Sequence, residues 1–353
     1  MISICMIVRD EEKYIGQCLQ KLKPLGYEMI IVDTGSNDRT KEIASEFTDK
    51  IYDFTWINDF SAARNFSIEK ATNDYVFIVD SDEMLIQFNK KRLEKLVKDN
   101  KSGIGTITCI NEFTRKGNVF RAHEQVARLF NRKYYQYEGM IHEQIIEKGT
   151  EEKYFYEIPL TAEHYGYEGD LEVRRKKTQR NIVLLEKQLL QEKEKKSDEV
   201  PYILYQLGKS YYMQEDYERA NEYFGEALYY DLNPQLVYVQ DMVESYGNCL
   251  LEAKEYETAL NLLGVYEEFS VSTDFVFLAG LIYMNNGYLK EAICEFEKAA
   301  SRKTCKTEGV NSYMAWYNIG VIYECVGNRE KAIEYYKKCG KYKFAIDGLN
   351  RLK

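Results

Sequence analysis

The sequence lacks several features that mark common functional classes. Basic residues are not in excess, because 48 Lys and Arg stand against 57 Asp and Glu and leave a net charge of −9. A protein that binds nucleic acid by neutralising phosphates needs the opposite balance, so that class is disfavoured. No apolar run approaches the length of a membrane span, and the start MISICMIVRDEEK has no basic lead and no cleavage-like site. We therefore expect a cytoplasmic protein without stable membrane insertion.

Paired cysteines and phosphate-binding glycine loops are also missing. The eight cysteines form no CxxC pair and no Cys/His spacing typical of zinc sites. Several lie within apolar patterns, which favours reduced structural thiols. No Gly-rich loop of the P-loop or dinucleotide type follows a predicted strand. A phosphate group bound to this protein would therefore need another source of positive charge, such as a metal ion.

An internal repeat is present in the C-terminal half. Glycine and alanine recur 12 residues apart in four places: Gly208/Ala220, Gly247/Ala259, Gly280/Ala292 and Gly320/Ala332. This spacing is typical of tetratricopeptide repeats, in which small residues let two antiparallel helices approach closely. The pattern predicts an all-α solenoid over 201–353, preceded by a linker helix over 171–200. Its concave face is expected to bind a polypeptide or to mediate self-association, unless the array only supports the first domain.

The first 170 residues alternate between apolar strands and helix-like segments. Apolar runs cover residues 2–8, 29–33, 50–54 and 75–80, and the segments between them have helical periodicity. Continuous apolar strands that alternate with helices indicate an α/β domain with a parallel sheet covered on both faces. The chain is thus expected to contain an α/β domain at 1–170, the linker helix and the repeat domain.

Two of the predicted strands end in carboxylates. Asp33 ends one of them, and the stretch YVFIVDSDEML ends another with Asp80, Ser81, Asp82 and Glu83. Ligands of open α/β sheets bind beyond the carboxyl ends of the strands, and a buried carboxylate is costly unless a cation compensates it. Two acids with one small residue between them can turn toward one hard cation, such as Mg²⁺ or Mn²⁺. The D-x-D pair alone is a weak signal of such a site.

Four segments taken together resemble the family-2 glycosyltransferases. They are SICMIVRDEEKYIGQCLQKL, IIVDTGSNDRTKEIA, NDFSAARNFSIEKATNDYVFIVDSDE and YEGMIHEQI, and the resemblance covers roughly residues 1–165. It implies a GT-A fold, that is, a Rossmann-like domain that uses nucleotide-diphospho-sugars. A GT-A domain followed by tetratricopeptide repeats is similar to a bacterial subgroup that glycosylates peptides and proteins.

The resemblance implies a donor site at the first two strand ends. Ile7, Val8 and Arg9 would line the nucleobase and ribose, largely through backbone atoms. Asp33 would accept hydrogen bonds from the base or ribose, although the family often has two acids at this point and here a threonine follows. Arg64, in SAARN, would reach the base or the diphosphate; the alternative is a structural ion pair.

The same resemblance implies a metal site. Asp80 would contact the ribose and the metal, with Ser81 beside it in the donor site, and Asp82 would bind the metal directly. His164 is expected as a further metal ligand or a diphosphate contact, the alternative being a structural histidine. The metal, Mn²⁺ or Mg²⁺, would bridge the two phosphates of a UDP-sugar.

Glu143, in YEGMIHEQI, is the candidate catalytic base. An inverting transfer needs a carboxylate that takes a proton from the acceptor, and the family places this acid at the start of a helix. His142 would orient Glu143 or line the acceptor pocket, and it departs from the family's more usual acidic pair. His123 and Arg128 are expected on the outer surface of the sheet, the alternative being a strand that faces the sugar pocket.

The sequence as a whole favours an inverting, metal-dependent glycosyltransferase. It would move a hexose from a UDP-sugar to a Ser or Thr hydroxyl or to a Cys thiol of a polypeptide, such as a bacteriocin precursor or a flagellin-like protein. The alternatives are a polysaccharide or lipid-linked acceptor, a non-catalytic interaction scaffold and, with less support, a nucleotidyltransferase. A homodimer is expected because an exposed repeat end needs a cap.

Overall fold

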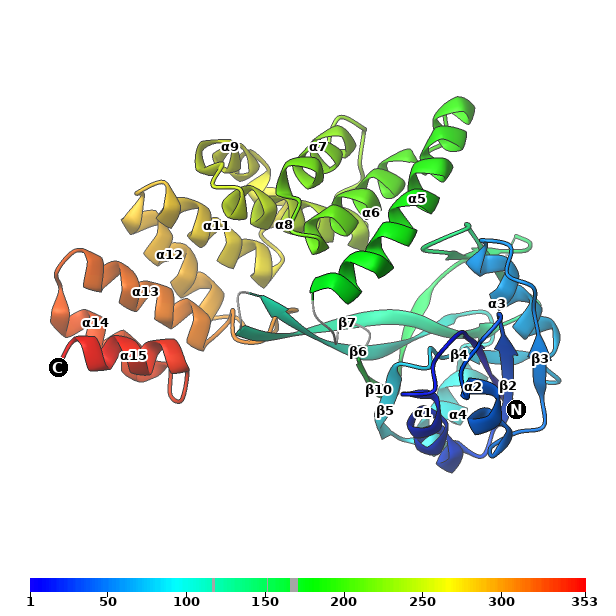
Figure 1. The fold of residues 1–353 in the computed structure, drawn as a ribbon. Coiled ribbons are helices and arrows are strands. Elements are labelled where there is room, and N and C mark those ends of the chain that lie inside the picture. The colour runs from blue at the N-terminus through cyan, green and yellow to red at the C-terminus, as the bar shows by residue number, and fades with distance from the viewer. Residues whose placement is uncertain (116–117, 151, 166–170) are drawn as a thin grey trace. The chain divides into compact units, whose positions relative to one another are not determined.

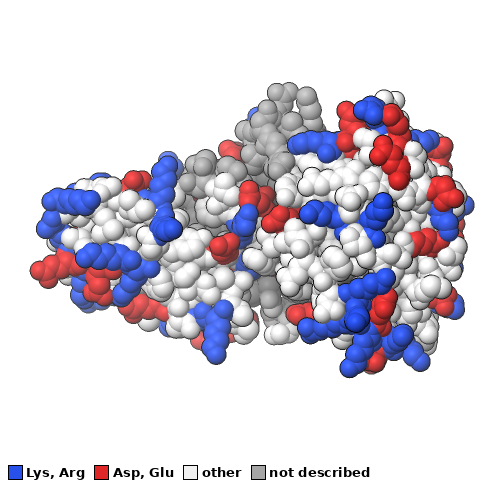
Figure 2. All heavy atoms as spheres, turned by 90° about the horizontal axis from the view of Figure 1, so that it is seen from below, with Lys and Arg blue, Asp and Glu red and all other residues white. Residues whose placement is uncertain are grey.

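The computed structural model describes residues 1–115, 118–150, 152–165 and 171–353. The chain divides into two compact units, Met1–Gly169 and Asp170–Lys353 (Figure 1). None of the helices within the described ranges is long and apolar enough to cross a membrane. On the face drawn in Figure 2, basic and acidic side chains are interspersed among large neutral areas, in keeping with the modest negative net charge.

An eight-stranded mixed sheet forms the centre of the N-terminal unit. Its strands, in spatial order, are β3 (Ile51–Asp53), β2 (Glu28–Asp33), β1 (Ile2–Val8), β4 (Tyr75–Ile78), β7 (Asn118–Asn131), β6 (Ile104–Arg115), β10 (Phe155–His164) and β5 (Glu83–Phe88). The first four are parallel to one another, as predicted. The later strands add antiparallel pairs, β4 with β7, β7 with β6 and β10 with β5. The sheet is mixed because β6 and β7 follow one another as antiparallel neighbours, whereas parallel neighbours require a longer crossover.

Helices cover both faces of the parallel half of this sheet, as predicted. Alternate residues of a strand point to opposite faces, so Ile4 and Met6 of β1 pack against α1 and α4 while Cys5 packs on the side of α3. All three β1 side chains are fully buried. The helices of this unit are α1 (Ile15–Leu22), η1 (Lys23–Leu25), α2 (Thr40–Ser45), α3 (Phe60–Glu69) and α4 (Lys90–Asp99).

Strand register gathers the predicted site residues at one edge of the sheet. Val8, at the end of β1, pairs with Asp33 at the end of β2. Strands β6 and β10 run in the same direction as β1, because β7 is antiparallel to both β4 and β6. His164, the last residue of β10, therefore ends at the same edge, where it pairs with Asn111 of β6 and with Glu83, the first residue of β5.

A two-stranded ribbon, β8 (Tyr135–Glu138) and β9 (Gln144–Glu147), packs beside α3. Asn65 of α3 donates through Nδ2 to the Tyr137 carbonyl (2.8 Å) and accepts through Oδ1 from the Tyr137 N–H (3.0 Å). The turn of the ribbon contains Gly139, whose φ of 102° lies in the left-handed region that favours glycine. Glu143 lies at the end of this turn, so the expected helix start at this acid was wrong.

Paired helices build the C-terminal unit. Its elements are α5 (Leu171–Lys195), α6 (Val200–Met213), α7 (Tyr217–Ala227), α8 (Val237–Glu252), α9 (Tyr256–Leu260), η2 (Asn261–Val265), α10 (Tyr266–Phe269), α11 (Thr273–Asn285), α12 (Leu289–Ala300), α13 (Tyr313–Cys325), α14 (Arg329–Lys338) and α15 (Lys343–Arg351). The linker helix α5 packs against α6. The second pair is irregular, because its second helix is divided into α9, η2 and α10. Gly264 lies in η2, and glycine is a poor helix former.

The repeat glycines allow close helix contacts, as predicted. A Cβ atom at Gly208 would lie 2.6 Å from the ring of Phe224, and one at Gly320 would lie equally close to the ring of Tyr336. Gly348 of α15 contacts the same Tyr336 ring, so α15 covers the last repeat from within the chain. The homodimer was expected because an exposed repeat end needs a cap. Since α15 covers the last repeat, that reason does not apply at this end, and the homodimer stays a prediction.

A partly buried group of polar and charged side chains ties the repeats together, and we call it the lysine cluster: Tyr205, Lys209, Asp241, Glu244 and Lys306. Asp241 accepts hydrogen bonds from the Tyr205 hydroxyl (2.5 Å), from Lys209 Nζ (2.9 Å) and from Lys306. Lys306 Nζ also lies 3.4 Å from Glu244 Oε2. Lys306 belongs to the connection between α12 and α13, whereas its acidic partners lie on α8. The cluster therefore links a connecting segment to a helix of an earlier repeat.

Candidate active site

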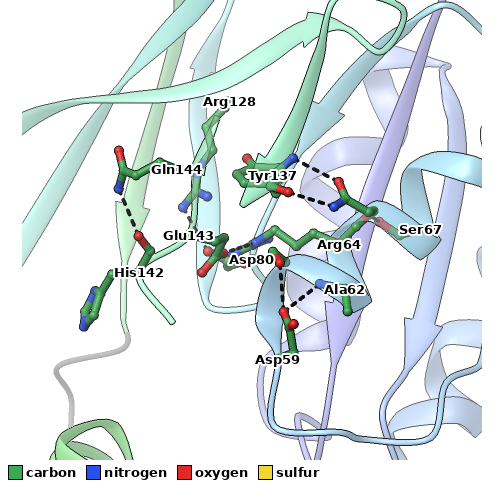
Figure 3. A network of polar contacts seen from close by, with 12 residues as sticks. Asp59, Ala62, Arg64, Ser67, Asp80, Arg128, Tyr137, His142, Glu143 and Gln144 are labelled. Atoms are coloured by element: carbon green, nitrogen blue, oxygen red, sulfur yellow. Dashed lines mark hydrogen bonds and ion pairs between the residues drawn. The ribbon is translucent and has the colours of Figure 1, made fainter. Parts of the chain in front are cut away.

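Two arginines and three acids form a largely buried network at the carboxyl edge of the sheet, and we call it the arginine cluster: Arg64, Asp80, Glu83, Arg128 and Glu143. Figure 3 shows four of its members, Arg64, Asp80, Arg128 and Glu143. Arg64 Nη2 lies 2.9 Å from Asp80 Oδ1, and Arg128 Nη2 lies 2.9 Å from Asp80 Oδ2. Arg64 Nε also pairs with Glu143, and Arg128 Nη2 also pairs with Glu83. The arginine side chains are only 9% and 12% exposed. Both oxygens of Asp80 are thus held by guanidinium groups.

The arginines keep Asp80 ionised. Burial raises the pKa of its carboxyl, but the charges of Arg64 and Arg128 outweigh this effect and hold the pKa well below its usual value. Glu83 behaves differently, because burial and the charge of Asp80 raise its pKa and Arg128 offsets only part of the rise. The two neighbouring acids therefore have pKa values that move in opposite directions.

Helix α3 positions Arg64. The side chain of Asp59 accepts a hydrogen bond from the Ala62 N–H (2.9 Å) and so caps the start of the helix. The Phe60 N–H donates to the Met140 carbonyl (2.8 Å), which joins the helix start to the turn that carries Glu143. The guanidinium of Arg64 lies 5.6 Å from the centre of the Tyr137 ring. The cap and the ribbon together direct Arg64 to the strand end.

Three buried polar atoms at this edge have no hydrogen-bond partner among the residues that the structure describes. They are Asp33 Oδ2, Arg64 Nη1 and Arg128 Nε. Asp33 is 2% exposed, and only its Oδ1 is engaged, by the backbone N–H groups of Gly35 and Ser36 at 2.9 Å each. Buried atoms without partners are uncommon and costly in folded proteins. One acceptor and two donors are thus available for a ligand.

Asp82 and His164 lie side by side near the cluster. His164 Nε2 is 3.4 Å from Asp82 Oδ2, and His164 Nδ1 is 2.9 Å from Asn111 Oδ1. Burial lowers the pKa of His164, but the hydrogen bond to Asp82 and the nearby acids outweigh it, so the pKa is raised above 6.5. In the part of the chain that the structure describes, no three His, Cys, Asp or Glu side chains are arranged to hold a metal ion. Asp82 and His164 nevertheless offer one carboxylate oxygen and one imidazole nitrogen, a donor set that suits Mn²⁺ or Mg²⁺ with further oxygens from phosphates and water.

The remaining predicted donor residues lie at the same edge. The Val8 carbonyl accepts from the N–H (2.9 Å) and the hydroxyl (3.1 Å) of Thr34, which joins the ends of β1 and β2. Ile7 is partly buried, Arg9 is exposed and Ser81 is 4% exposed. The predicted donor residues therefore lie at the same edge of the sheet. Their position does not test their roles, which stay predictions.

His142 does not point toward the acid that it was expected to orient. Its ring is directed away from Glu143 in Figure 3, and its backbone φ of 50° lies in the left-handed region. Its carbonyl accepts a hydrogen bond from Gln144 Nε2 (3.0 Å). Of the two roles predicted for His142, lining an acceptor pocket is the one compatible with this orientation.

The expectation for Arg128 was wrong, whereas the one for His123 is confirmed. His123 is exposed on β7, but Arg128 is buried in the arginine cluster. The register of β6 with β7 shifts at this point, because Thr106 pairs with Ala127 and Gly105 with Leu129, so Arg128 is an extra residue in β7 and the regular alternation of the strand is broken there. Glu83 was also missed, since nothing in the sequence shows that it faces Arg128.

Comparisons with known proteins agree with this architecture. Residues 3–150 match the model of glycosyl transferase family 2, and residues 201–234, 273–303 and 314–343 match tetratricopeptide repeat models. A TPR repeat-containing protein of Synechococcus elongatus is 38% identical over 143 residues, which are 40% of this chain and 34% of that protein. The SPbeta prophage-derived glycosyltransferase SunS of Bacillus subtilis is 28% identical over 251 residues, 69% of this chain and 57% of SunS.

Among solved structures, the TPR protein YrrB is 23% identical and covers 51% of this chain and 87% of its own, with a TM-score of 0.41. The alignments with the two curated relatives span 34% and 57% of their lengths. The α/β unit with its acidic strand ends and the paired helices after residue 200 agree with the family matches. The chain therefore carries a family-2 glycosyltransferase domain with a GT-A type fold, followed by a solenoid of tetratricopeptide repeats.

Proposed function

We propose that the N-terminal unit transfers a hexose from a UDP-sugar to a polypeptide side chain, with inversion at the anomeric carbon. The observation that carries this proposal is a set of three buried atoms at one edge of the sheet that have no partner among the described residues: Asp33 Oδ2, Arg64 Nη1 and Arg128 Nε. A nucleoside diphosphate offers the complementary groups, because its ribose hydroxyls and base N–H groups donate and its phosphate oxygens accept. The family match supports glycosyl transfer as the reaction.

Glu143 is the proposed base. Its Oε1 pairs with Arg64 Nε, which orients the carboxylate, while Oε2 would take the proton of the acceptor hydroxyl or thiol. The acceptor oxygen or sulfur then forms a bond to the anomeric carbon as the bond from that carbon to the diphosphate oxygen breaks, and UDP leaves. A thiol with a pKa of about 8.5 gives up its proton more easily than a hydroxyl, so the same base suits both acceptors.

A divalent cation, Mn²⁺ or Mg²⁺, is proposed at Asp82 and His164. When bound there, it would supply positive charge to the diphosphate. Asp80 was expected as a third ligand, but each of its oxygens faces an arginine, so it would have to release one of them before it could bind a metal. In the arrangement seen here, Asp80 fixes the two guanidinium groups on which the phosphate contacts depend.

The repeat unit is proposed to hold the polypeptide acceptor, such as a bacteriocin precursor or a flagellin-like protein. Stacked repeats present extended concave surfaces that suit a polypeptide better than a sugar chain. This proposal places the acceptor in the cytoplasm, where the nucleotide sugar is also available. A saccharide or lipid-linked acceptor remains the alternative outcome of an acceptor screen.

Release of UDP in the absence of acceptor tests the proposed chemistry, since water can replace the acceptor. We expect Glu143→Gln to lower the rate of UDP release about 100-fold or more and to leave UDP-sugar affinity within about threefold, because the amide oxygen still accepts from Arg64. Glu138→Gln is the matched control, since Glu138 is an exposed acid of the same ribbon. An unchanged rate in Glu143→Gln would refute the assignment of the base, and no release by the wild type from any UDP-hexose would contradict the proposed reaction.

A further inference from the structure

The ribbon of β8 and β9 carries the proposed base, Glu143, in the turn between its two strands. A two-stranded ribbon is only marginally stable by itself, so its position depends on the elements against which it packs. This ribbon packs beside α3. Its turn is tight, because a Cβ atom at Gly139 would lie 3.5 Å from the Cα atom of Glu143. The contacts that fix β8 against α3 therefore also place the base.

Asn65 of α3 binds β8 directly before this turn. Its Oδ1 accepts from the Tyr137 N–H (3.0 Å), and its Nδ2 donates to the Tyr137 carbonyl (2.8 Å). The N–H and carbonyl of one residue in an antiparallel strand point to the same side, so Tyr137 directs both groups away from β9 and toward α3. The side-chain amide of Asn65 thus takes the place of a neighbouring strand along the outer edge of β8.

The chemistry of asparagine matches this position. The Tyr137 N–H can only donate and its carbonyl can only accept, which fixes the end of the Asn65 amide that faces each group. An ionised aspartate could accept but not donate, and an aliphatic side chain could do neither. Tyr137 is 5% exposed, so water would replace the lost hydrogen bonds poorly.

Arg64 and Asn65, which are neighbours on α3, hold the ribbon at two points. Arg64 Nε pairs with the carboxylate of Glu143, while Asn65 pairs with the backbone of Tyr137. The first contact orients the carboxylate, and the second fixes the strand from which the turn begins. Both contacts are needed for a defined position of the base, because a carboxylate that is bound at one oxygen still moves with its backbone.

We propose that Asn65 is a positioning residue, which fixes β8 against α3 and so sets the distance between Glu143 and the reacting atoms. The inference rests on the proposed function, because it takes Glu143 as the base. Asn65 acts through the ribbon and would contact neither the sugar donor nor the acceptor. Its loss should therefore lower the rate of the reaction and leave donor binding nearly unchanged.

The rate of UDP release without acceptor tests this role, with UDP-glucose, UDP-N-acetylglucosamine and UDP-galactose as the probes. We expect Asn65→Leu to lower the rate about tenfold or more, since a small misplacement of a reacting group is costly, and to leave UDP-sugar affinity within about threefold. Glu69→Gln, at an exposed position of the same helix, is the matched control and should change neither quantity. An unchanged rate in Asn65→Leu, or a rate and an affinity that fall together, would overturn the proposal.

A double variant separates positioning from a general loss of structure. In the background of Glu143→Gln, we expect Asn65→Leu to change the rate by less than about twofold, because the group that Asn65 positions is already lost. A further loss of about tenfold in that background would contradict the positioning role. If Asn65→Leu does not fold, Asn65→Asp replaces it, since aspartate keeps the shape and the acceptor but loses the donor. A wild-type rate in Asn65→Asp would then overturn the proposal.

Hydrogen exchange of the backbone amides measures the contact itself and needs no reaction. We expect the Tyr137 N–H to exchange slowly in the wild type and about tenfold faster or more in Asn65→Leu, while the amides of β1 stay unchanged. Unchanged exchange at Tyr137 would refute the assigned contact even in an active enzyme. No UDP release by the wild type from any probe would refute the proposed function and with it the effect on the rate, while exchange would still decide whether Asn65 holds the ribbon.

Discussion

The arginine cluster of the N-terminal unit and the lysine cluster of the C-terminal unit both hold acids beside cations, yet they differ in how their polar atoms are satisfied. In the lysine cluster, Asp241 receives hydrogen bonds from three donors, and no buried side-chain atom of the cluster lacks a partner within the described residues. In the arginine cluster, Arg64 Nη1 and Arg128 Nε are buried without partners among those residues. In a cluster that only stabilises the fold, the polar atoms hydrogen-bond with one another. A cluster that binds a ligand leaves some donors without a protein partner.

The cations also differ in where they are anchored. Arg64 and Arg128 lie on a helix and a strand and are almost fully buried, whereas Lys306 lies on a connecting segment with a third of its side chain exposed. Arginine offers several donors in a fixed plane, which suits simultaneous binding of two acids and a phosphate, while lysine is a single flexible charge. The comparison supports the proposal that the first cluster binds a ligand, whereas we expect the second only to stabilise the repeats.

Removal of Arg128 should have the largest effect on stability. Arg128→Met leaves Glu83 buried and Asp80 partly buried with one cation fewer, and loss of one partner of a buried ion pair costs about 3 to 5 kcal/mol. Urea unfolding of the variant should show this loss. Arg121→Met, on the same strand but half exposed, is the control and should change the free energy of unfolding by less than about 1 kcal/mol. Equal losses in the two variants would show that Arg128 is not an anchor of the cluster.

Removal of Lys306 should have a moderate effect that is confined to the repeats. Lys306→Met deprives Asp241 and Glu244 of a cation, but Lys209 still pairs with Asp241 and solvent reaches the site, so we expect a loss of about 1 to 2 kcal/mol. UDP-sugar binding should not change. Lys303→Met, in the same connection and exposed, is the control. Weaker UDP-sugar binding by Lys306→Met would contradict the expectation that the lysine cluster acts only on the stability of the repeats.

A partly buried acid outside the two clusters, Glu28, should have the smallest effect, and its contribution to stability should be lost at acid pH. It begins β2, at the sheet edge opposite the arginine cluster, and accepts hydrogen bonds from Lys50, Ser3 and Thr72. Burial raises its pKa, but these hydrogen bonds outweigh burial and lower the pKa from 4.5 to about 2. A lowered folded-state pKa stabilises the fold above pH 4.5, and this contribution is lost as the pH falls toward about 2.

Urea unfolding of Glu28→Gln at several pH values checks this expectation. The variant should be less stable than the wild type at pH 7, and the difference should shrink as the pH falls from about 4.5 to about 2. Glu69→Gln, an exposed acid of the same unit, is the control. If the difference in stability between Glu28→Gln and the wild type does not depend on pH, hydrogen bonds in the folded state do not lower the pKa of Glu28.

Local patterns predicted much of the fold and part of the site. The Gly-to-Ala spacing predicted the paired helices because Gly208, Gly280 and Gly320 each meet an aromatic ring of the next helix. The apolar runs of β1, β2 and β4 predicted parallel strands because these strands are buried on both faces. Asp33, Asp80 and Asp82 could be placed at the site since strand ends share an edge of the sheet.

Contacts between residues that lie far apart in the sequence could not be predicted. Arg128 reaches Asp80 across 48 residues, and it does so only because β7 is antiparallel to β4, which no local pattern reveals. Asn65 and Tyr137, 72 residues apart, are likewise brought together by the packing of the ribbon beside α3 and not by a local pattern. Glu143 was assigned to a helix start, but Gly139 permits a tight turn that leads directly into β9.

Calorimetric titration with UDP-sugars tests the central claim most directly. UDP-glucose, UDP-N-acetylglucosamine and UDP-galactose would be titrated into the wild type and into Asp82→Asn, each with and without Mn²⁺. The account predicts that at least one of the three binds the wild type, that Mn²⁺ strengthens this binding, and that Asp82→Asn loses the effect of the metal. If none of the three binds the wild type under either condition, the assignment of the carboxyl edge of the sheet as a nucleotide-sugar site is contradicted.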